Sequence, residues 1–147
     1  MDRGAGCQAG RVNPRVSLIT LVVADLDASR RFYVDGLGWA PELDAPGEVL
    51  MFRVAEKLLL SLWDHQHATA EIGPVTVGGT PPVTIAHNLA TPAAVDAVLE
   101  DARRAGAPLV EQAEPRDWGG YSGYFADPDG FRWEIAVNPT PLGESLL

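Results

Sequence analysis

Glu134 is the residue whose type and position best suit chemistry, because it stands in the strand-like segment FRWEIAV, residues 131–137. Side chains of a strand alternate between two faces. One face of this segment is apolar and carries Phe131, Trp133, Ile135 and Val137. The other carries Arg132, Glu134 and Ala136. The apolar face belongs beneath helices, so we expect Glu134 to face a cleft, where it could act as a general base, bind a ligand or pair with Arg132.

A second group of candidate site residues lies in the segment DWGGYSGY, residues 117–124. Its glycines permit tight bends and a close approach of the backbone. Trp118, Tyr121 and Tyr124 offer flat surfaces with polar edges for an aromatic or planar ligand, although the same rings could fill a core or a dimer interface. Ser61 and Trp63 alternate along LLLSLWD and could line the same cleft.

The elements that must position these residues begin with a buried strand. Residues 16–24 (VSLITLVVA) are β-branched and apolar, as such a strand requires. Asp25 predicts the N-cap of a helix that runs to about Leu37, with Gly36 and Gly38 as its stop signal. Three short strands are then predicted, over residues 40–44, 49–54 and 57–63.

The same order of elements returns after a polar connector over residues 65–82, in which we expect one helical turn near residues 68–72. Residues 83–89 predict a strand, Thr91 and Pro92 begin a helix, and Gly106 ends it. Three further strands are predicted over residues 109–112, 120–126 and 131–138. The chain is therefore predicted to contain a flexible leader (1–15), one domain (16–139) built from modules 16–64 and 83–138, and a tail (140–147).

Composition and charge exclude several classes of function. The 147 residues fit one domain with a real core. The formal net charge of -9 disfavours nucleic acid and anionic membrane surfaces as partners. No apolar run approaches the ~20 residues that span a bilayer. Cys7 is the only cysteine, so no internal disulfide can form, which fits the reducing cytoplasm.

Two segments, VVADLDASRRFYVDGLGW (22–39) and FADPDGFRWEIAVNP (125–139), resemble the vicinal-oxygen-chelate superfamily. That superfamily contains glyoxalase I, extradiol dioxygenases, fosfomycin-inactivating enzymes and bleomycin-binding proteins. The resemblance covers about residues 16–139. It implies an α+β fold in which two βαβββ modules form paired half-barrel sheets around one cleft, and a homodimer as in many relatives.

The resemblance also implies four positions for ligands of a divalent metal, two in each half. Leu18 and Ser61 match the two positions of the first half, and Glu134 matches the late-strand position of the second half. Leucine cannot bind a metal and serine is a poor ligand. We therefore expect no metal cofactor. The pair His65 and His67 stands in the predicted connector and is interpreted as a solvated loop.

The fourth position depends on the register of residues 83–89. Counting back from Gly106 places His87 there, beside Glu134, and these two residues would bind a divalent metal if one is present. Strand alternation instead places Thr84 there, turns Asn88 to the cleft and turns His87 to the helices. We favour the second register, because apolar periodicity is harder to break than a one-residue loop insertion.

These observations favour a small-molecule binding protein of the glyoxalase/bleomycin-resistance type, cytoplasmic and without a catalytic metal, whose ligand is aromatic or cationic. The expected ligand-binding residues are Ser61, Trp63, Thr84, Asn88, Trp118, Tyr121, Tyr124 and Arg132. The alternative is a lyase, isomerase or dioxygenase that uses Glu134 as its catalytic residue, with or without a divalent metal. A dimeric interaction module without a ligand is a third class.

Overall fold

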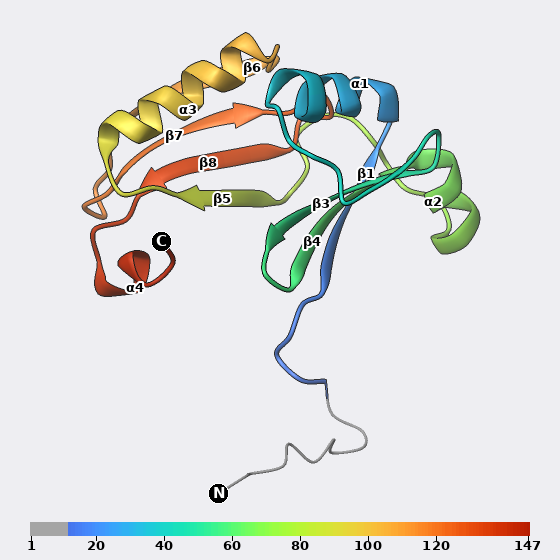
Figure 1. The fold of residues 1–147 in the computed structure, drawn as a ribbon, viewed down its shortest axis with the longest axis horizontal. Helices are drawn as coiled ribbons and strands as arrows, with labels where there is room; N and C mark the ends of the chain where they lie inside the picture. The colour runs from blue at the N-terminus through green and yellow to red at the C-terminus, as the bar shows by residue number, and fades with distance from the viewer. Residues whose placement is uncertain (1–11) are drawn as a thin grey trace, which may run out of the picture.

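The computed structural model describes residues 12–147, so Cys7 and most of the predicted leader lie outside the described residues. The described chain forms two separate four-stranded sheets with helices packed against them (Figure 1). Each sheet is built from one half of the sequence. The α+β architecture of two βαβββ modules, expected from the repeat, is therefore confirmed.

The first module follows the predicted order of elements: β1 (Leu18–Val23), α1 (Leu26–Arg30), the π-helix η1 (Arg31–Gly36), β2 (Leu43–Ala45), β3 (Val49–Ala55) and β4 (Leu58–Asp64). Its strand order is β1-β4-β3-β2, with β1 parallel to β4 and the other pairs antiparallel. Asp25 caps α1 as predicted, because its carboxylate accepts hydrogen bonds from the N–H groups of Asp27 (3.0 Å) and Ala28 (3.2 Å). Gly38, at φ 76°, is the left-handed residue that follows the helices.

The second module repeats this order: β5 (Thr84–Asn88), α3 (Pro92–Arg104), β6 (Leu109–Pro115), β7 (Tyr121–Ala126) and β8 (Arg132–Val137). Its strand order is β5-β8-β7-β6, and its first strand is again parallel to its last. Thr91 caps α3 by accepting a hydrogen bond from the Ala94 N–H (3.2 Å), and Pro92 occupies the first turn, as predicted.

Two helices lie outside this repeat and were not predicted at this length. α2 (His65–Ile72) fills the start of the predicted connector, and α4 (Pro141–Glu144) lies in the predicted tail. α2 begins early because the Asp64 carboxylate accepts hydrogen bonds from the N–H groups of Gln66 (3.0 Å) and His67 (3.3 Å). The interpretation of His65 and His67 as a solvated loop is therefore wrong: both lie on a helix, and the His67 ring contacts its cap.

The two modules meet where η1 approaches the C-terminal end of α3. A Cβ added to Gly36 would lie 2.7 Å from the Cβ of Ala105, so a larger residue at Gly36 would force the modules apart. Phe32 and Tyr33, also on η1, are both buried. The π-helical segment thus supplies side chains for the contact with the second module, and Trp39, which follows it, packs edge-on against Trp133.

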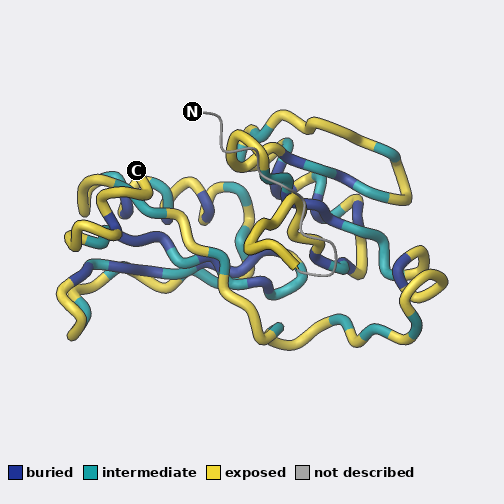
Figure 2. Tube along the Cα trace, turned by 90° about the horizontal axis from the view of Figure 1, so that it is seen from below, coloured by how far each residue is buried: buried dark blue, intermediate teal, exposed yellow. Residues whose placement is uncertain are grey.

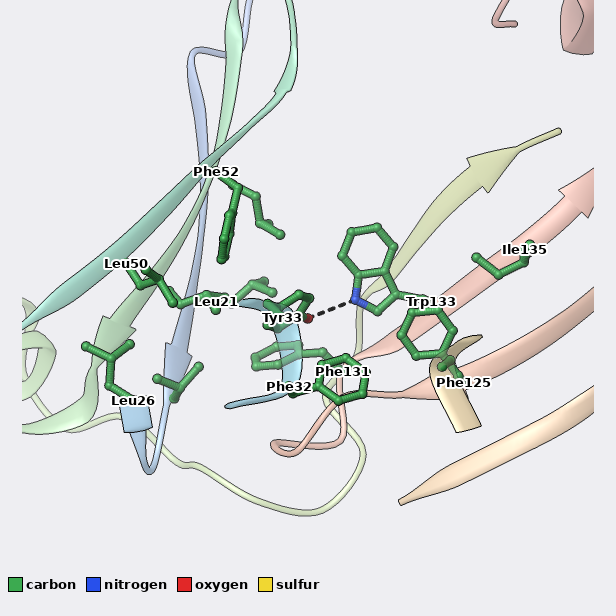
Figure 3. Packing of buried hydrophobic residues seen from close by; sticks show 14 of the residues in the cluster. Leu21, Leu26, Phe32, Tyr33, Leu50, Phe52, Phe125, Phe131, Trp133 and Ile135 are labelled. Carbon is green, nitrogen blue, oxygen red and sulfur yellow. Dashed lines mark hydrogen bonds between the residues drawn. The ribbon is translucent and has the colours of Figure 1, made fainter. Parts of the chain in front are cut away.

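One hydrophobic core spans both modules, with Tyr33 at its centre (Figure 3). The Tyr33 hydroxyl donates a hydrogen bond to Asp127 Oδ2 (2.7 Å) and accepts one from Trp133 Nε1 (3.0 Å). The other carboxylate oxygen of Asp127 accepts the N–H groups of Asp129 (3.0 Å) and Phe131 (2.9 Å). A tyrosine of the first module is therefore bonded to two groups of the second, and all of these groups are buried apart from Asp129, which is partly exposed.

Both sheets turn one face toward this shared core, and the sheets do not close into a barrel. The core-facing residues include Leu21, Val23, Leu50, Phe52, Leu60 and Leu62 of the first sheet and Phe125, Trp133 and Ile135 of the second. Figure 2 shows buried stretches inside both halves and exposed loops around them. Because side chains alternate along strands, the other face of each sheet points outward, away from the core.

Burial of Asp127 has a consequence for stability. Its side chain is fully enclosed, and this desolvation raises its pKa to about 6, although hydrogen bonds from Tyr33 and from the Phe131 N–H favour the charged form. A carboxyl whose folded-state pKa exceeds its unfolded value binds a proton more tightly in the folded state. The free energy of unfolding therefore falls as pH rises from about 4 to about 6 and is constant, for this group, above that range.

Asp127→Asn should remove this pH dependence, because the amide does not ionise. Between about pH 4 and 6.5 the wild-type free energy of unfolding should fall by up to about 3 kcal/mol relative to that of the variant. Urea unfolding followed by tryptophan fluorescence at several pH values measures the difference. The exposed control Asp117→Asn should run parallel to the wild type. If the free energy of unfolding of Asp127→Asn ran parallel to that of the wild type across this pH range, the raised pKa assigned to Asp127 would be contradicted.

Candidate functional site

Glu134 lies in a row of residues across the outward face of the second sheet. The strand register pairs Ala86 with Glu134, Glu134 with Tyr124, and Tyr124 with Glu111. Paired residues on neighbouring strands share a face. Trp133, on the other face of β8, is buried in the core, as the alternation predicted. Glu134 itself is partly exposed.

Arg116 covers the middle of this row and was not predicted as a site residue. Its Cζ lies 5.8 Å from the centroid of the Tyr124 ring. Its guanidinium donates hydrogen bonds to Ser122 Oγ (3.0 Å) and Ser122 O (2.9 Å) and forms an ion pair with Glu114 (2.8 Å). The position of Arg116 depends on the loop before β7, and no periodic signal in the sequence marks it.

The electrostatics of the row keep the Tyr124 hydroxyl neutral. Burial raises the Tyr124 pKa, and the negative charge of Glu134 raises it further, while Arg116 opposes the shift. Tyr124 is therefore a hydrogen-bond donor beside a carboxylate, with a guanidinium over its ring. Such a set can hold a ligand that presents a cationic or hydroxyl group to Glu134 and a planar group to the ring.

The register of β5 settles the position of His87. His87 pairs with Ile135 and Ala86 pairs with Glu134, so His87 lies on the core-facing side. The favoured register is confirmed. His87 and Glu134 lie on opposite faces of the sheet. The prediction that these two residues would together bind a divalent metal is therefore wrong within one chain. Thr84 and Asn88 lie on the same face as Glu134.

Arg132 shares the outward face with Glu134, two residues away on β8. It pairs with Thr84 across the sheet, and its guanidinium reaches the Gly130 carbonyl at 3.4 Å. Within residues 12–147 it forms no ion pair with Glu134, so the alternative in which Arg132 neutralises that carboxylate is not seen.

The aromatic residues of the segment 117–124 do not form one group. Tyr121 lies on the core-facing side of β7, where its hydroxyl donates a hydrogen bond to Asp96 of α3 (2.7 Å). It therefore does not join Tyr124, contrary to prediction, because residues an odd number of positions apart lie on opposite faces of a strand. Trp118 lies in the loop before β7, half-exposed, with its ring packed directly on Gly120.

Ser61 and Trp63 lie together on the outward face of the first sheet, as their alternation predicted. Ser61 pairs with Thr20 and Met51, and Ser61 is buried. Because both sheets turn their other faces to the common core, this face and the Glu134 face point away from each other. Within a single chain, Ser61 and Trp63 therefore do not lie beside Glu134.

The cleft between the modules is a groove of about 830 Å³, lined mainly by core-facing side chains. Its walls include Trp39, Phe52, Ile85, Val98, Trp133 and Ile135. Of the predicted ligand-binding residues only Thr84, on the edge strand β5, borders it. We call this cavity the inter-module groove.

The positions that correspond to metal ligands in the fold family do not fit a divalent metal. Leu18 has no donor atom, Ser61 and Thr84 offer neutral hydroxyls, and Glu134 alone provides a carboxylate. Across residues 12–147, no three His, Cys, Asp or Glu side chains gather in a metal-binding arrangement. One carboxylate with neutral hydroxyls is too weak a donor set to support a reaction step through a bound metal.

None of the helices in the described part of the chain combines the length and the apolar character that a bilayer span requires.

Comparisons with known proteins give a consistent result. A sequence model described as the Glyoxalase/Bleomycin resistance protein/Dioxygenase superfamily matches residues 15–135. The solved structure of a glyoxalase-related enzyme from Fulvimarina pelagi is 36% identical, with a TM-score of 0.78 over 86% of this chain and 90% of that one. No curated protein matches the chain.

Two further solved structures are similar at lower identity. A glyoxalase/bleomycin resistance protein/dioxygenase from Nocardioides is 27% identical, with a TM-score of 0.71 over 88% of this chain and 86% of that one. A lactoylglutathione lyase from Agrobacterium tumefaciens is 26% identical, with a TM-score of 0.66 over 87% of this chain and 96% of that one.

Gly120→Ala should displace the Trp118 ring, because an added Cβ would occupy the space of that ring. The displaced indole should be more accessible to solvent, so acrylamide should quench the tryptophan fluorescence of the variant more strongly than that of the wild type. In a Trp118→Phe background the same substitution should leave quenching unchanged. An increase that persists without Trp118 would contradict the packing described above.

Proposed function

Because the chain belongs to the glyoxalase/bleomycin resistance protein/dioxygenase superfamily, we propose that it is a small-molecule binding protein of this type that works without a catalytic metal. The observation that carries the proposal is the outward row of the second sheet, where Glu134, Tyr124 and Arg116 present a carboxylate, a ring and a cation side by side. A cytoplasmic location is proposed with it, supported by the single cysteine of the chain.

The proposed ligand carries a planar group and a cationic or hydroxyl group. Glu134 accepts hydrogen bonds from the polar group, and the Tyr124 ring stacks on the planar group. Thr84, Asn88 and Arg132 surround the carboxylate on the same face and select among polar substituents. Trp118, half-exposed in the neighbouring loop, adds apolar surface at the edge.

Glu134→Gln should weaken binding of bleomycin, a cationic glycopeptide, by about 10- to 100-fold, because a hydrogen bond to a charged group contributes about 1.5–3 kcal/mol. Isothermal titration calorimetry measures the dissociation constant. Bleomycin serves as the probe because the superfamily to which the chain belongs includes bleomycin resistance proteins.

The matched control is Glu56→Gln, which removes one negative charge from the exposed β3–β4 turn and should leave the dissociation constant unchanged. If the Glu134→Gln and Glu56→Gln variants bind bleomycin with equal dissociation constants, Glu134 does not contact the ligand. If a panel of aromatic amines and bleomycin gives no heat with the wild type, the proposal of a cationic aromatic ligand fails.

We propose further that the site is completed in a homodimer. Within one chain the outward faces of the two sheets point away from each other, so the face with Ser61 and Trp63 can reach Glu134 only from a second copy. The outward face of the first sheet is apolar at its edges, with Leu18 45% and Leu43 48% exposed. Apolar side chains exposed on a sheet face favour contact with another surface.

Leu43→Lys should therefore weaken both dimerisation and bleomycin binding. A lysine on an apolar contact face leaves a charge without a partner, so the dimer dissociation constant should rise at least about tenfold. Light scattering coupled to size-exclusion chromatography, over a range of concentrations, gives the mass. Leu142→Lys, at a residue of α4 that is 72% exposed, is the control and should leave the mass in solution unchanged. A monomeric wild type that still binds bleomycin would overturn this arrangement.

The alternative function is that of a lyase, isomerase or dioxygenase of the same superfamily. The similarity to the lactoylglutathione lyase favours it, as does the Glu134–Tyr124 pair, in which the carboxylate could accept a proton while the hydroxyl donates a hydrogen bond. Formation of S-lactoylglutathione from the adduct of methylglyoxal and glutathione by the wild type, lost in Glu134→Gln and kept in Glu56→Gln, would decide for this alternative against simple binding.

A further inference from the structure

The inter-module groove is lined mainly by core-facing side chains, which lie on the other side of the sheets from Glu134, and Thr84 and Ala86 of the edge strand β5 also border it. Its floor is formed by the rings of Phe52 and Trp133 from the two sheets. Its sides are formed by Ile85 of β5, Val98 of α3 and Trp39 of the segment after η1, all of them partly exposed. Aromatic and aliphatic carbon from both modules thus surrounds one hollow of about 830 Å³.

This size and lining are those of a small-molecule site rather than of a packing defect. Ligand pockets in proteins measure about 300–1,000 Å³ and are lined mainly by apolar side chains with a few polar groups. The hollow has walls from two separate modules, so a small molecule placed in it contacts protein on opposite sides. It would cover apolar surface that the folded chain otherwise leaves in water.

The charged groups at the groove are not balanced. Arg53 lines it, but its guanidinium is neutralised by Glu42 at 2.8 Å and also donates to the Glu56 carbonyl at 2.9 Å. Asp101 lines it from α3 and forms no ion pair with any residue of 12–147. The carboxylate of Asp101 therefore gives the groove a net negative end, on a chain whose formal net charge is -9.

We infer that the inter-module groove is a second binding site, for a small apolar molecule that carries one cationic end. The apolar body lies between Ile85 and Val98 over the aromatic floor, and the cation lies beside Asp101. The partly exposed indole of Trp39 offers a further surface to which cations are attracted. The site does not involve Glu134, Tyr124 or Arg116, so it does not depend on the function proposed for the outward face.

The experiment compares two probes of equal chain length and opposite charge, decyltrimethylammonium and decanoate, each kept below its micelle-forming concentration. Both should displace N-phenyl-1-naphthylamine, a neutral apolar fluorophore, from the full-length protein. The cation should bind about tenfold more tightly than the anion, because the Asp101 carboxylate attracts the cation and repels the anion. Equal affinity of the two probes would overturn the role of Asp101.

Two pairs of variants locate the site. Val98→Phe fills the groove and should raise the dissociation constant of the cationic probe at least about tenfold. Ala97→Phe places the same ring on the exposed side of α3 and should leave that dissociation constant unchanged. Asp101→Asn should reduce the preference for the cation to within about threefold. Glu71→Gln, which removes one charge from exposed α2, should keep that preference.

Three results would overturn the inference. Val98→Phe and Ala97→Phe could weaken binding of the cationic probe equally, which would indicate adsorption of the probe to exposed apolar surface. Val98→Phe could leave probe binding intact and lower the mass in solution, which would make the groove an interface covered by a second copy. Glu134→Gln could abolish probe binding while Val98→Phe does not, which would place the probe on the outward face.

Discussion

The structure depends on the buried hydrogen bonds that join Tyr33, Asp127 and Trp133. Burying a carboxylate is unfavourable unless its oxygens are satisfied, and here Tyr33 and two backbone N–H groups satisfy both oxygens of Asp127. These partners come from η1 and from the turn between β7 and β8, so satisfying the carboxylate requires the two modules to be docked. The backbone of Ala24 adds a second link, because its N–H donates to Asp129 at 2.7 Å.

This docking decides which surfaces are available for function. With one face of each sheet committed to the common core, the residues that alternate with the core positions must point outward. Glu134 and Tyr124 therefore lie on the outward face of the second sheet, where Arg116 of the preceding loop joins them, and all three are partly exposed. Ser61 and Trp63 occupy the corresponding face of the first sheet, which is turned away from it. The space left between the modules is lined instead by core-type side chains and becomes the apolar inter-module groove.

The two faces of the second sheet thus present different chemistry a few residues apart. On β5 and β8, Ala86 and Glu134 share one side while His87 and Ile135 share the other. A one-residue change in the register of β5 would exchange these sets, placing an imidazole beside the carboxylate and a methyl group on the core-facing side. The apolar alternation of β5 therefore separates a polar ligand face from an apolar one, and it also separates His87 from the carboxylate with which it could have bound a metal.

The sequence by itself determined the modules, their order, the caps at Asp25 and Thr91, and the faces on which Glu134, Thr84 and His87 lie. These features depend on local periodicity and on hydrogen bonds within a few residues. Only the tertiary structure decided how the modules dock, because that depends on contacts such as Tyr33 to Asp127, which are 94 residues apart. Long-range packing therefore separated Ser61 from Glu134, drew Tyr121 to Asp96 and opened the groove, and the loop before β7 placed Arg116 over Tyr124. A period of two along a strand specifies none of these.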